Sequence, residues 1–311
     1  MNKLIYKDKF YQNICNICGN KNTHFVFNRP DGLGVFECQN CGLAFVNPMP
    51  SKENILEIYK NQNIDFETLK NKFYDQKKTG SNKSIIRRIS KFKKISGSRI
   101  LDIGCGPGFL LYDLKKAGAK GTGLEISKAL VSFGRKELGL DIQEGTLENS
   151  SLSLASFDIV VCSNLIEHLS DPIGFFSRLD RVLAPAGIVY FSTPNYDATK
   201  EYGNKWPGFY KDFEHIFYFN KRSLTYALSR LDLKPIKFFY LPQTGGIIGK
   251  KNINYEKSSS RTKIRKILLN TPILNKFLWE MIFLTRRLAN SKSIREGTAF
   301  EMEAIFEKTK V

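Results

Sequence analysis

The chain has 311 residues, of which 42% are hydrophobic and 13% aromatic, and this composition excludes a disordered or low-complexity protein. Lysine and arginine outnumber aspartate and glutamate by 48 to 30, but most of the net charge of +18 lies in two segments, residues 72–94 and 250–292. No apolar run is long enough to predict a membrane span, and the first residues lack a signal-peptide pattern. We therefore expect a cytoplasmic protein whose six cysteines stay reduced.

Four of the six cysteines lie near the start, as the pairs Cys15-x2-Cys18 and Cys38-x2-Cys41. A glycine follows each pair, which suits a tight turn that presents two thiolates to one tetrahedral ion. The spacing predicts a zinc ribbon over residues 1–47, and the alternative is four unligated thiols. Four thiolates would fill every position around the zinc ion, so the predicted site is structural rather than catalytic.

Residues 48–94 are polar with a helical pattern. A proline-rich start followed by Glu53 and Glu57 predicts one helix, and an apolar stripe that includes Ile85 and Ile89 predicts a second, basic one. We expect this segment to be a helical connector that packs on the domain behind it.

From residue 95 to the end, short apolar segments alternate with amphipathic ones, which predicts an α/β domain with a mainly parallel sheet. Three glycines fall where helices should end, at Gly118, Gly139 and Gly187. The expected strands are 99–103, 121–125, 141–144, 157–162, 188–192, 236–241 and 299–307, and the expected helices are 109–117, 128–138, 173–183 and 221–231.

The first expected strand runs into a D-x-G-x-G-x-G turn formed by Asp102, Gly104, Gly106 and Gly108. Glycines at such a turn let a ligand approach the backbone at the carboxyl end of the strand. A dinucleotide-binding fingerprint requires glycine or alanine where this chain has Phe109, and no lysine follows the turn as a P-loop requires. The pattern therefore excludes both of these nucleotide sites.

This turn resembles the first motif of class I S-adenosylmethionine-dependent methyltransferases. The similarity extends to Glu125 at the end of the second strand and to the stretches 156–161, 165–169 and 214–220. It implies a Rossmann-like seven-stranded sheet with a reversed last strand and S-adenosylmethionine as cofactor. It further implies that Glu125 accepts hydrogen bonds from the ribose hydroxyls. The other cofactor-binding residues that the resemblance implies are Asp102, Gly104, Gly106 and Gly108 in the turn, with Thr146 and Leu147 near the adenine.

Methyl transfer to a hydroxyl group needs alignment of the acceptor and a general base for its proton. Two of the three histidines follow a glutamate, as Glu167-His168 and Glu214-His215. In similar sugar-methylating enzymes the pair that corresponds to Glu214-His215 is the proposed base, which makes His215, Glu214 and His168 the catalytic candidates. The alternative is that either histidine caps or packs a turn of the fold.

Between Tyr190 and Phe219, eleven of thirty residues are aromatic. We expect this segment to cover the active site and to stack on a sugar ring or hold a hydrophobic acceptor, or else to attach a lid to the sheet. A four-cysteine ribbon ahead of such a domain resembles bacterial surface-glycan and sugar methyltransferases. The main interpretation is therefore methylation of a hydroxyl on a sugar or surface-polysaccharide precursor.

Residues 250–292 mix basic and apolar side chains, which fits either contact with an anionic membrane surface or a helical hairpin packed on the protein. The alternative functions are an RNA methyltransferase, a lipid or quinone O-methyltransferase, and a scaffold without catalysis. The ribbon itself carries no basic excess, which does not favour nucleic acid as a partner. An intact glycine turn with Glu125 argues against a scaffold that has lost cofactor binding.

Overall fold

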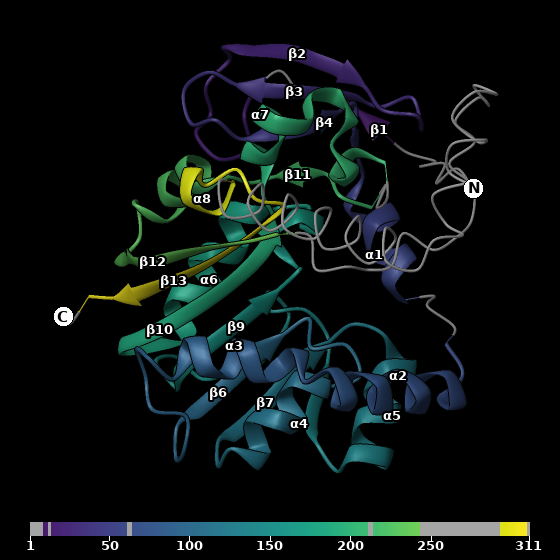
Figure 1. Ribbon diagram of the computed structural model, residues 1–311, viewed down its shortest axis with the longest axis vertical. Helices are drawn as coiled ribbons and strands as arrows, with labels where there is room; N and C mark the ends of the chain where they lie inside the picture. Colours follow the sequence, from purple (N-terminus) through teal and green to yellow (C-terminus); the bar gives the residue numbers. More distant parts are fainter. Residues whose placement is uncertain (1–8, 12–13, 61–63, 211–213, 243–292, 310–311) are drawn as a thin grey trace, which may run out of the picture.

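The computed structural model describes residues 9–11, 14–60, 64–210, 214–242 and 293–309 (Figure 1). The basic segment expected to be an amphipathic insertion, 250–292, lies outside these residues. None of the helices within the described ranges combines the length and the apolar content that a bilayer crossing requires.

A seven-stranded sheet forms the centre, with the strand order β12-β13-β10-β9-β6-β7-β8. Neighbouring strands from β10 to β8 run parallel, whereas β13 runs antiparallel to both β10 and β12. The predicted Rossmann-like sheet with a reversed last strand is thus confirmed. The strands are β6 (Arg99–Ile103), β7 (Lys120–Glu125), β8 (Asp141–Glu144), β9 (Phe157–Ser163), β10 (Leu183–Pro194), β12 (Leu233–Leu241) and β13 (Glu301–Lys308).

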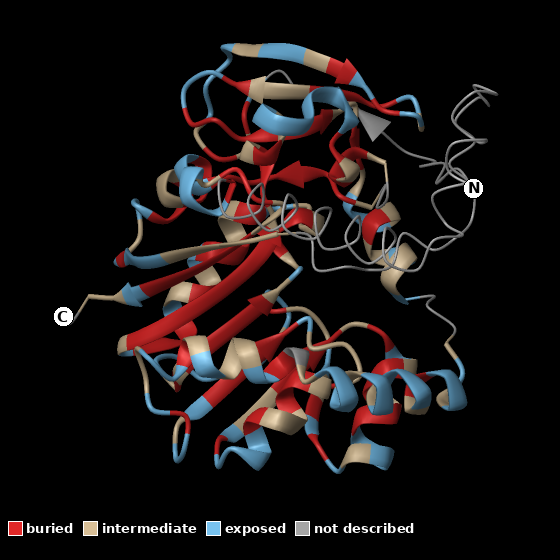
Figure 2. Ribbon diagram, in the orientation of Figure 1, coloured by how far each residue is buried: buried red, intermediate tan, exposed pale blue. Residues whose placement is uncertain are grey.

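The central strands of the sheet are buried along most of their length (Figure 2). The two faces of the sheet bury separate apolar clusters, as the alternation along a strand requires. On β9, Ile159 and Val161 face a cluster that includes residues of α3 and α4, while Val160 and Cys162 face one that includes residues of α6 and α8. The helices of the sheet domain are α4 (Phe109–Lys116), α5 (Lys128–Leu138), α6 (Pro172–Val182) and α8 (Lys221–Leu228).

Local signals account for most of the helix ends. Asp171 caps α6 by accepting a hydrogen bond from the Gly174 amide, and Gly139 ends α5 in the left-handed conformation at φ 61°. The expectation that Gly187 ends a helix is wrong, because α6 ends at Val182 and Gly187 lies inside β10. A side chain at Gly187 would come within 2.7 Å of the Ala184 carbonyl oxygen, so glycine is needed where the strand bulges.

The connector forms three helices, α1 (Lys52–Lys60), α2 (Phe66–Thr79) and α3 (Ser81–Ile89). Helix α3 buries Ile89 against the sheet, and Arg88 pairs with the buried carboxylate of Glu303 on β13. Helix α2 is held by an ion pair between Lys77 and Asp113 of α4. Part of the basic excess of residues 72–94 therefore fixes the connector to the sheet domain.

The N-terminal ribbon is built into the rest of the chain. Its sheet has the order β11-β4-β3-β2, and β11 comes from residues that follow the central strand β10 by more than twenty positions. Ribbon residues share one continuous core cluster with α6, α8 and one face of the central sheet. The strands are β2 (Thr23–Asn28), β3 (Gly34–Cys38), β4 (Ala44–Asn47) and β11 (Phe217–Tyr218), and a separate pair joins β1 (Lys9–Phe10) to β5 (Met49–Pro50).

Candidate active site at the carboxyl ends of the strands

A cavity of about 200 Å³ opens at the carboxyl ends of β6, β7 and β9, where doubly wound sheets bind their ligands. One side is formed by backbone-rich turns after β6, β7 and β8. The opposite side is formed by α1 and by the short helix η1 (Ile166–His168) with its flanking residues. Among the lining residues are Gly104, Glu125, Thr146 and Leu147 on the first side, and Ile55, Leu56, Tyr59, Leu165, His168 and Leu169 on the second.

Glu125 organises the turn side of the cavity. One carboxylate oxygen accepts a hydrogen bond of 2.9 Å from the Gly106 amide, and the other accepts bonds of 2.8 Å from the amides of Ile126 and Ser127. The carboxylate therefore joins the end of β7 to the glycine turn after β6. Because it also lines the cavity, its two oxygens have the chemistry to accept a pair of ligand hydroxyls.

The three glycines of the turn differ in their positions relative to the cavity. Gly104 lines the cavity with a left-handed backbone at φ 68°, and a side chain there would meet Leu165 at 3.0 Å, so glycine permits both this turn and the close approach of Leu165. Gly106 and Gly108 are not part of the cavity wall. A side chain at Gly108 would come within 2.4 Å of Leu140, so this glycine permits α4 to pack on β8.

Asp102 lies beneath the turn rather than on the cavity wall, and only 3% of its surface is exposed. Burial, with a further contribution from the charge of Glu125, raises the pKa of Asp102 to about 7. The expected adenine-side residues Thr146 and Leu147 both line the cavity, and Leu147 is fully buried. The two groups of cofactor candidates thus meet at the same edge of the sheet.

The structure brings the two candidate histidines together, but only His168 reaches the cavity. The rings of His168 and His215 lie 4.6 Å apart, centre to centre, and His215 is buried behind the wall. Burial lowers the pKa of His168 to about 4 and lowers the pKa of His215 well below its usual value. Both imidazoles are therefore neutral at physiological pH.

The hydrogen-bond partners of His168 suggest which of its nitrogens is available. Its Nδ1 lies 2.6 Å from the Tyr59 hydroxyl and 3.3 Å from the Glu214 carbonyl oxygen. Since a carbonyl oxygen can only accept, we assign the proton to Nδ1 and the lone pair to Nε2. The buried carboxylate of Glu167 lies 3.9 Å from Nε2, where it favours an imidazolium. Glu214 contributes its backbone carbonyl here.

Sequence reasoning did not identify the α1 wall, including Tyr59. Its side chain reaches across 109 residues of sequence to meet His168, and no local motif marks such a contact. The one available signal was the apolar spacing of Ile55 and Tyr59, four residues apart on a predicted helix.

The aromatic segment 190–219 does not line the cavity with any of its described residues, so it is not the expected stacking cover. Trp206, Phe209 and Tyr218 are buried and pack on one another and on the ribbon, where Phe27 contacts Phe209 at 4.5 Å between ring centres. The Tyr196 hydroxyl also donates to Glu37 of the ribbon at 2.9 Å. These aromatics attach the ribbon to the sheet domain, whereas the alternative expectation had them attach a lid.

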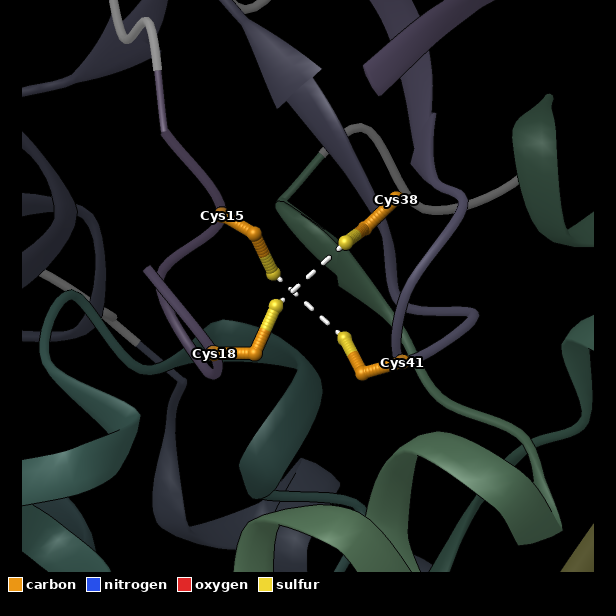
Figure 3. A group of neighbouring side chains, drawn as sticks. All are labelled: Cys15, Cys18, Cys38 and Cys41. Carbon is orange, nitrogen blue, oxygen red and sulfur yellow. Dashed lines mark hydrogen bonds between the residues drawn. The ribbon is translucent and has the colours of Figure 1, made fainter. Parts of the chain in front are cut away.

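The four ribbon cysteines converge on one point, with all four sulfur atoms within 4.8 Å of one another (Figure 3). The closest sulfur pairs are Cys18 to Cys38 at 3.4 Å and Cys15 to Cys41 at 3.5 Å. A tetrahedral zinc ion with Zn–S bonds of about 2.3 Å needs sulfur atoms about 3.8 Å apart, so the arrangement fits such an ion. His24 lies exposed on β2, outside the cluster.

The profile of a methyltransferase domain family matches residues 74–237, which is more than half of the chain. The ubiquinone biosynthesis O-methyltransferase of Nitrosococcus oceani is 31% identical over 156 residues, which cover 46% of this chain and 65% of that protein. The protein of the same name from Aromatoleum aromaticum is 35% identical over 107 residues, covering 32% of this chain and 46% of the relative. The chain thus spans less than two thirds of the length of these curated relatives.

Among solved structures, the geranyl diphosphate C-methyltransferase of Streptomyces coelicolor is similar in fold. The TM-score is 0.50 with 13% identical residues, and the match covers 74% of this chain and 77% of that one. At this level of identity the similarity concerns the fold alone.

Proposed function

Because the chain belongs to the methyltransferase domain family, and is thus an S-adenosylmethionine-dependent methyltransferase, we propose that its acceptor is a hydroxyl group on the aromatic ring of an apolar molecule. The observation that carries this proposal is the pair of apolar side chains on α1, Ile55 and Leu56, which line the cavity on the same side as His168. The relatives named ubiquinone biosynthesis O-methyltransferases support the same acceptor class, which replaces the sugar hydroxyl expected from the sequence.

The turn side of the cavity fits the cofactor. In the proposal, Glu125 accepts the ribose hydroxyls, the backbone of Gly104 borders the bound cofactor, and Thr146 with Leu147 contact the adenine. When bound, S-adenosylmethionine supplies an electrophilic methyl group on a sulfonium, which is already a good leaving group. The protein therefore has to align the acceptor oxygen and exclude water rather than activate the donor.

On the other side, Ile55 and Leu56 would contact the apolar body of the acceptor and His168 would receive its proton. The bound cofactor would supply the methyl carbon to the acceptor oxygen, and its sulfur would keep the electron pair of the broken carbon–sulfur bond. The hydroxyl proton passes to Nε2 of His168, and Glu167 stabilises the resulting imidazolium. His215 packs behind this histidine, and Tyr59 holds its Nδ1 side.

The proposal also assigns a structural zinc ion to Cys15, Cys18, Cys38 and Cys41. With all four positions taken by sulfur, the ion has no place for water or substrate, so its contribution is to folding. The sulfur–sulfur distances of 3.5 Å between Cys15 and Cys41 and 3.4 Å between Cys18 and Cys38 support this assignment.

The test offers three classes of acceptor with radiolabelled S-adenosylmethionine: a catechol carrying a short isoprenyl chain, a sugar nucleotide and total RNA. We expect methylation of the catechol, with kcat falling about 100-fold to 10,000-fold in His168→Gln as for loss of a general base. Transfer to the sugar nucleotide or to RNA, with none to the catechol, would overturn the proposed acceptor. Full activity of His168→Gln on the catechol would remove His168 as the base.

A further inference from the structure

Arg29 is a buried arginine in the turn between β2 and β3 of the ribbon, with 2% of its surface exposed. Its guanidinium pairs with Asp31 in the same turn through Nε and Nη2. Its Nη1 donates to the His215 carbonyl oxygen at 2.6 Å and to the Tyr218 hydroxyl at 2.8 Å, across more than 180 residues of sequence. Burying a guanidinium is costly unless its donors are satisfied, so this site is built to bind residues 214–218.

The segment that Arg29 holds lies between the ribbon and the cavity wall. On the ribbon side, the Val46 amide donates to the Ile216 carbonyl at 3.0 Å. On the cavity side, the Ile216 amide donates to the Glu167 carbonyl at 2.9 Å, and the Glu214 carbonyl contacts Nδ1 of His168. Contacts therefore run without interruption from the ribbon, through residues 214–218, to the histidine on the cavity wall.

We propose that Arg29 is a positioning residue for methyl transfer, which fixes residues 214–218 from the ribbon and thereby holds the His168 imidazole in place at the cavity. This inference rests on the proposed role of His168. It makes the ribbon a part of the acceptor side of the active site. The contacts of Arg29 with the His215 carbonyl and the Tyr218 hydroxyl lie on the acceptor side, whereas Glu125 is held by the amides of the glycine turn, so we expect replacement of Arg29 to leave the affinity for S-adenosylmethionine unchanged.

The geometry also explains why arginine occupies this position. Its planar group can pair with a carboxylate along one edge while another nitrogen donates to a carbonyl and a hydroxyl. A lysine at the same place has a single nitrogen and cannot satisfy Asp31, His215 and Tyr218 in these directions. Arg29→Lys should therefore retain the buried charge and recover only part of the function.

The decisive readout is the state of the histidine rings, which does not depend on knowing the acceptor. The chain has three histidines, so selective ¹⁵N labelling gives three imidazoles, with exposed His24 as the internal reference. In Arg29→Met we expect the ¹⁵N shifts of His168 and His215 to change while those of His24 stay. With the isoprenyl catechol as probe, kcat should fall at least tenfold, and the calorimetric Kd for S-adenosylmethionine should stay within twofold.

A matched control is Arg88→Met, which removes a half-buried arginine from its pair with the buried carboxylate of Glu303 on the opposite face of the sheet. It should lower stability without moving the His168 signals. A milder variant, Tyr218→Phe, removes only one acceptor of Arg29 and should shift the His168 signals in the same direction by less, which keeps the test valid if Arg29→Met does not fold.

Unchanged His168 signals and unchanged kcat in Arg29→Met or Tyr218→Phe would overturn the inference, as would an equal His168 shift in Arg88→Met. If His168 is not the general base, the outcome is different. His168→Gln would then keep its activity, while the ¹⁵N shifts of His168 and His215 would still change in Arg29→Met.

Discussion

The two sides of the cavity are built in opposite ways. The cofactor side comes from one continuous stretch, residues 102–148, which contains the turns that follow the neighbouring parallel strands β6, β7 and β8. The acceptor side is lined by residues from 52–59 and 165–175, with residues 214–218 and Arg29 of the ribbon behind them. A binding surface made of consecutive turns depends on local backbone geometry, whereas one made of distant segments depends on everything that holds those segments together.

This difference predicts that substitutions in the ribbon and substitutions in the turns will impair different functions. Loss of the ribbon should affect the acceptor side and spare cofactor binding, and changes in the turns should do the reverse.

The double substitution Cys38→Ser with Cys41→Ser should have the largest effect, because it removes two of the four thiolates that fit a zinc ion. Binding of structural zinc contributes about 10 kcal/mol or more in small ribbons. We expect loss of one equivalent of bound zinc by elemental analysis, a fall of at least 10 °C in Tm, and at least 100-fold loss of kcat.

Calorimetric titration with S-adenosylmethionine then tests the separation, since Kd should change by less than fivefold. Cys162→Ala is the control, because it removes a buried cysteine of the sheet and leaves the ribbon intact. An unchanged Tm and metal content in the double variant would contradict the structural role of the cluster.

Glu125→Gln should have the reverse effect. The variant keeps the shape of the side chain but loses the charge that strengthens hydrogen bonds from the turn amides and from the proposed ribose hydroxyls. Hydrogen bonds to a charged group contribute about 1.5–3 kcal/mol, so Kd for S-adenosylmethionine should rise about 10-fold to 100-fold. Glu144→Gln, an exposed carboxylate at the end of β8, should leave Kd unchanged. Equal effects of the two variants would show that Glu125 does not bind the cofactor.

The same contrast explains how far the sequence could be interpreted. The glycine turn and the positions of the strands follow from local patterns, because glycine spacing and strand periodicity are set by neighbours along the chain. The role of Glu125 and the reversed last strand were implied by the resemblance to class I methyltransferases. The cysteine cluster was also predictable, since two short pairs carry a complete ligand set. All of these features belong to the continuous side of the cavity or to the ribbon taken alone.

The acceptor side could not be predicted in this way, because its contacts are long-range. Each histidine follows a glutamate, and the resemblance to sugar-methylating enzymes favoured His215 as the base, whereas the fold places His168 on the cavity wall and His215 behind it. In the sequence, Arg29 has the pattern of an exposed turn residue. The pairing of β11 with β4 of the ribbon brings the His215 carbonyl oxygen to its guanidinium. The aromatic segment was recognised as unusual, yet composition does not tell which surface it covers.

The pH dependence of stability tests the burial of the His168 imidazole, with an expected effect of intermediate size. Burial lowers its pKa to about 4, from about 6.5 in the unfolded chain, so the unfolded state binds more protons between these values. The free energy of unfolding should therefore fall as pH decreases through this window, by about 2 kcal/mol at pH 5 for this group.

Asp102, whose pKa is raised to about 7, acts in the opposite direction, so the comparison should be made between variants. Urea unfolding at pH 7 and pH 5 should show that the difference in stability between the wild-type protein and His168→Gln shifts by about 2 kcal/mol in favour of the variant at pH 5. A constant difference would indicate that the imidazole is solvated rather than buried at the wall.

The smallest expected effect concerns the α1 wall. Leu56→Ala removes part of an apolar side chain that lines the cavity without touching the glycine turn. At about 0.8 kcal/mol for each fully buried methylene, a partly buried leucine should lose about 1 kcal/mol of acceptor binding, or about fivefold in KM. Since this contact is the same in the ground state and the transition state, kcat should not change.

Glu57→Ala, on the exposed side of the same helix, is the control for helix stability. A rise in Kd for S-adenosylmethionine with an unchanged KM for the catechol would place α1 on the cofactor side, and the division of the cavity into a local and an assembled side would fail at this wall.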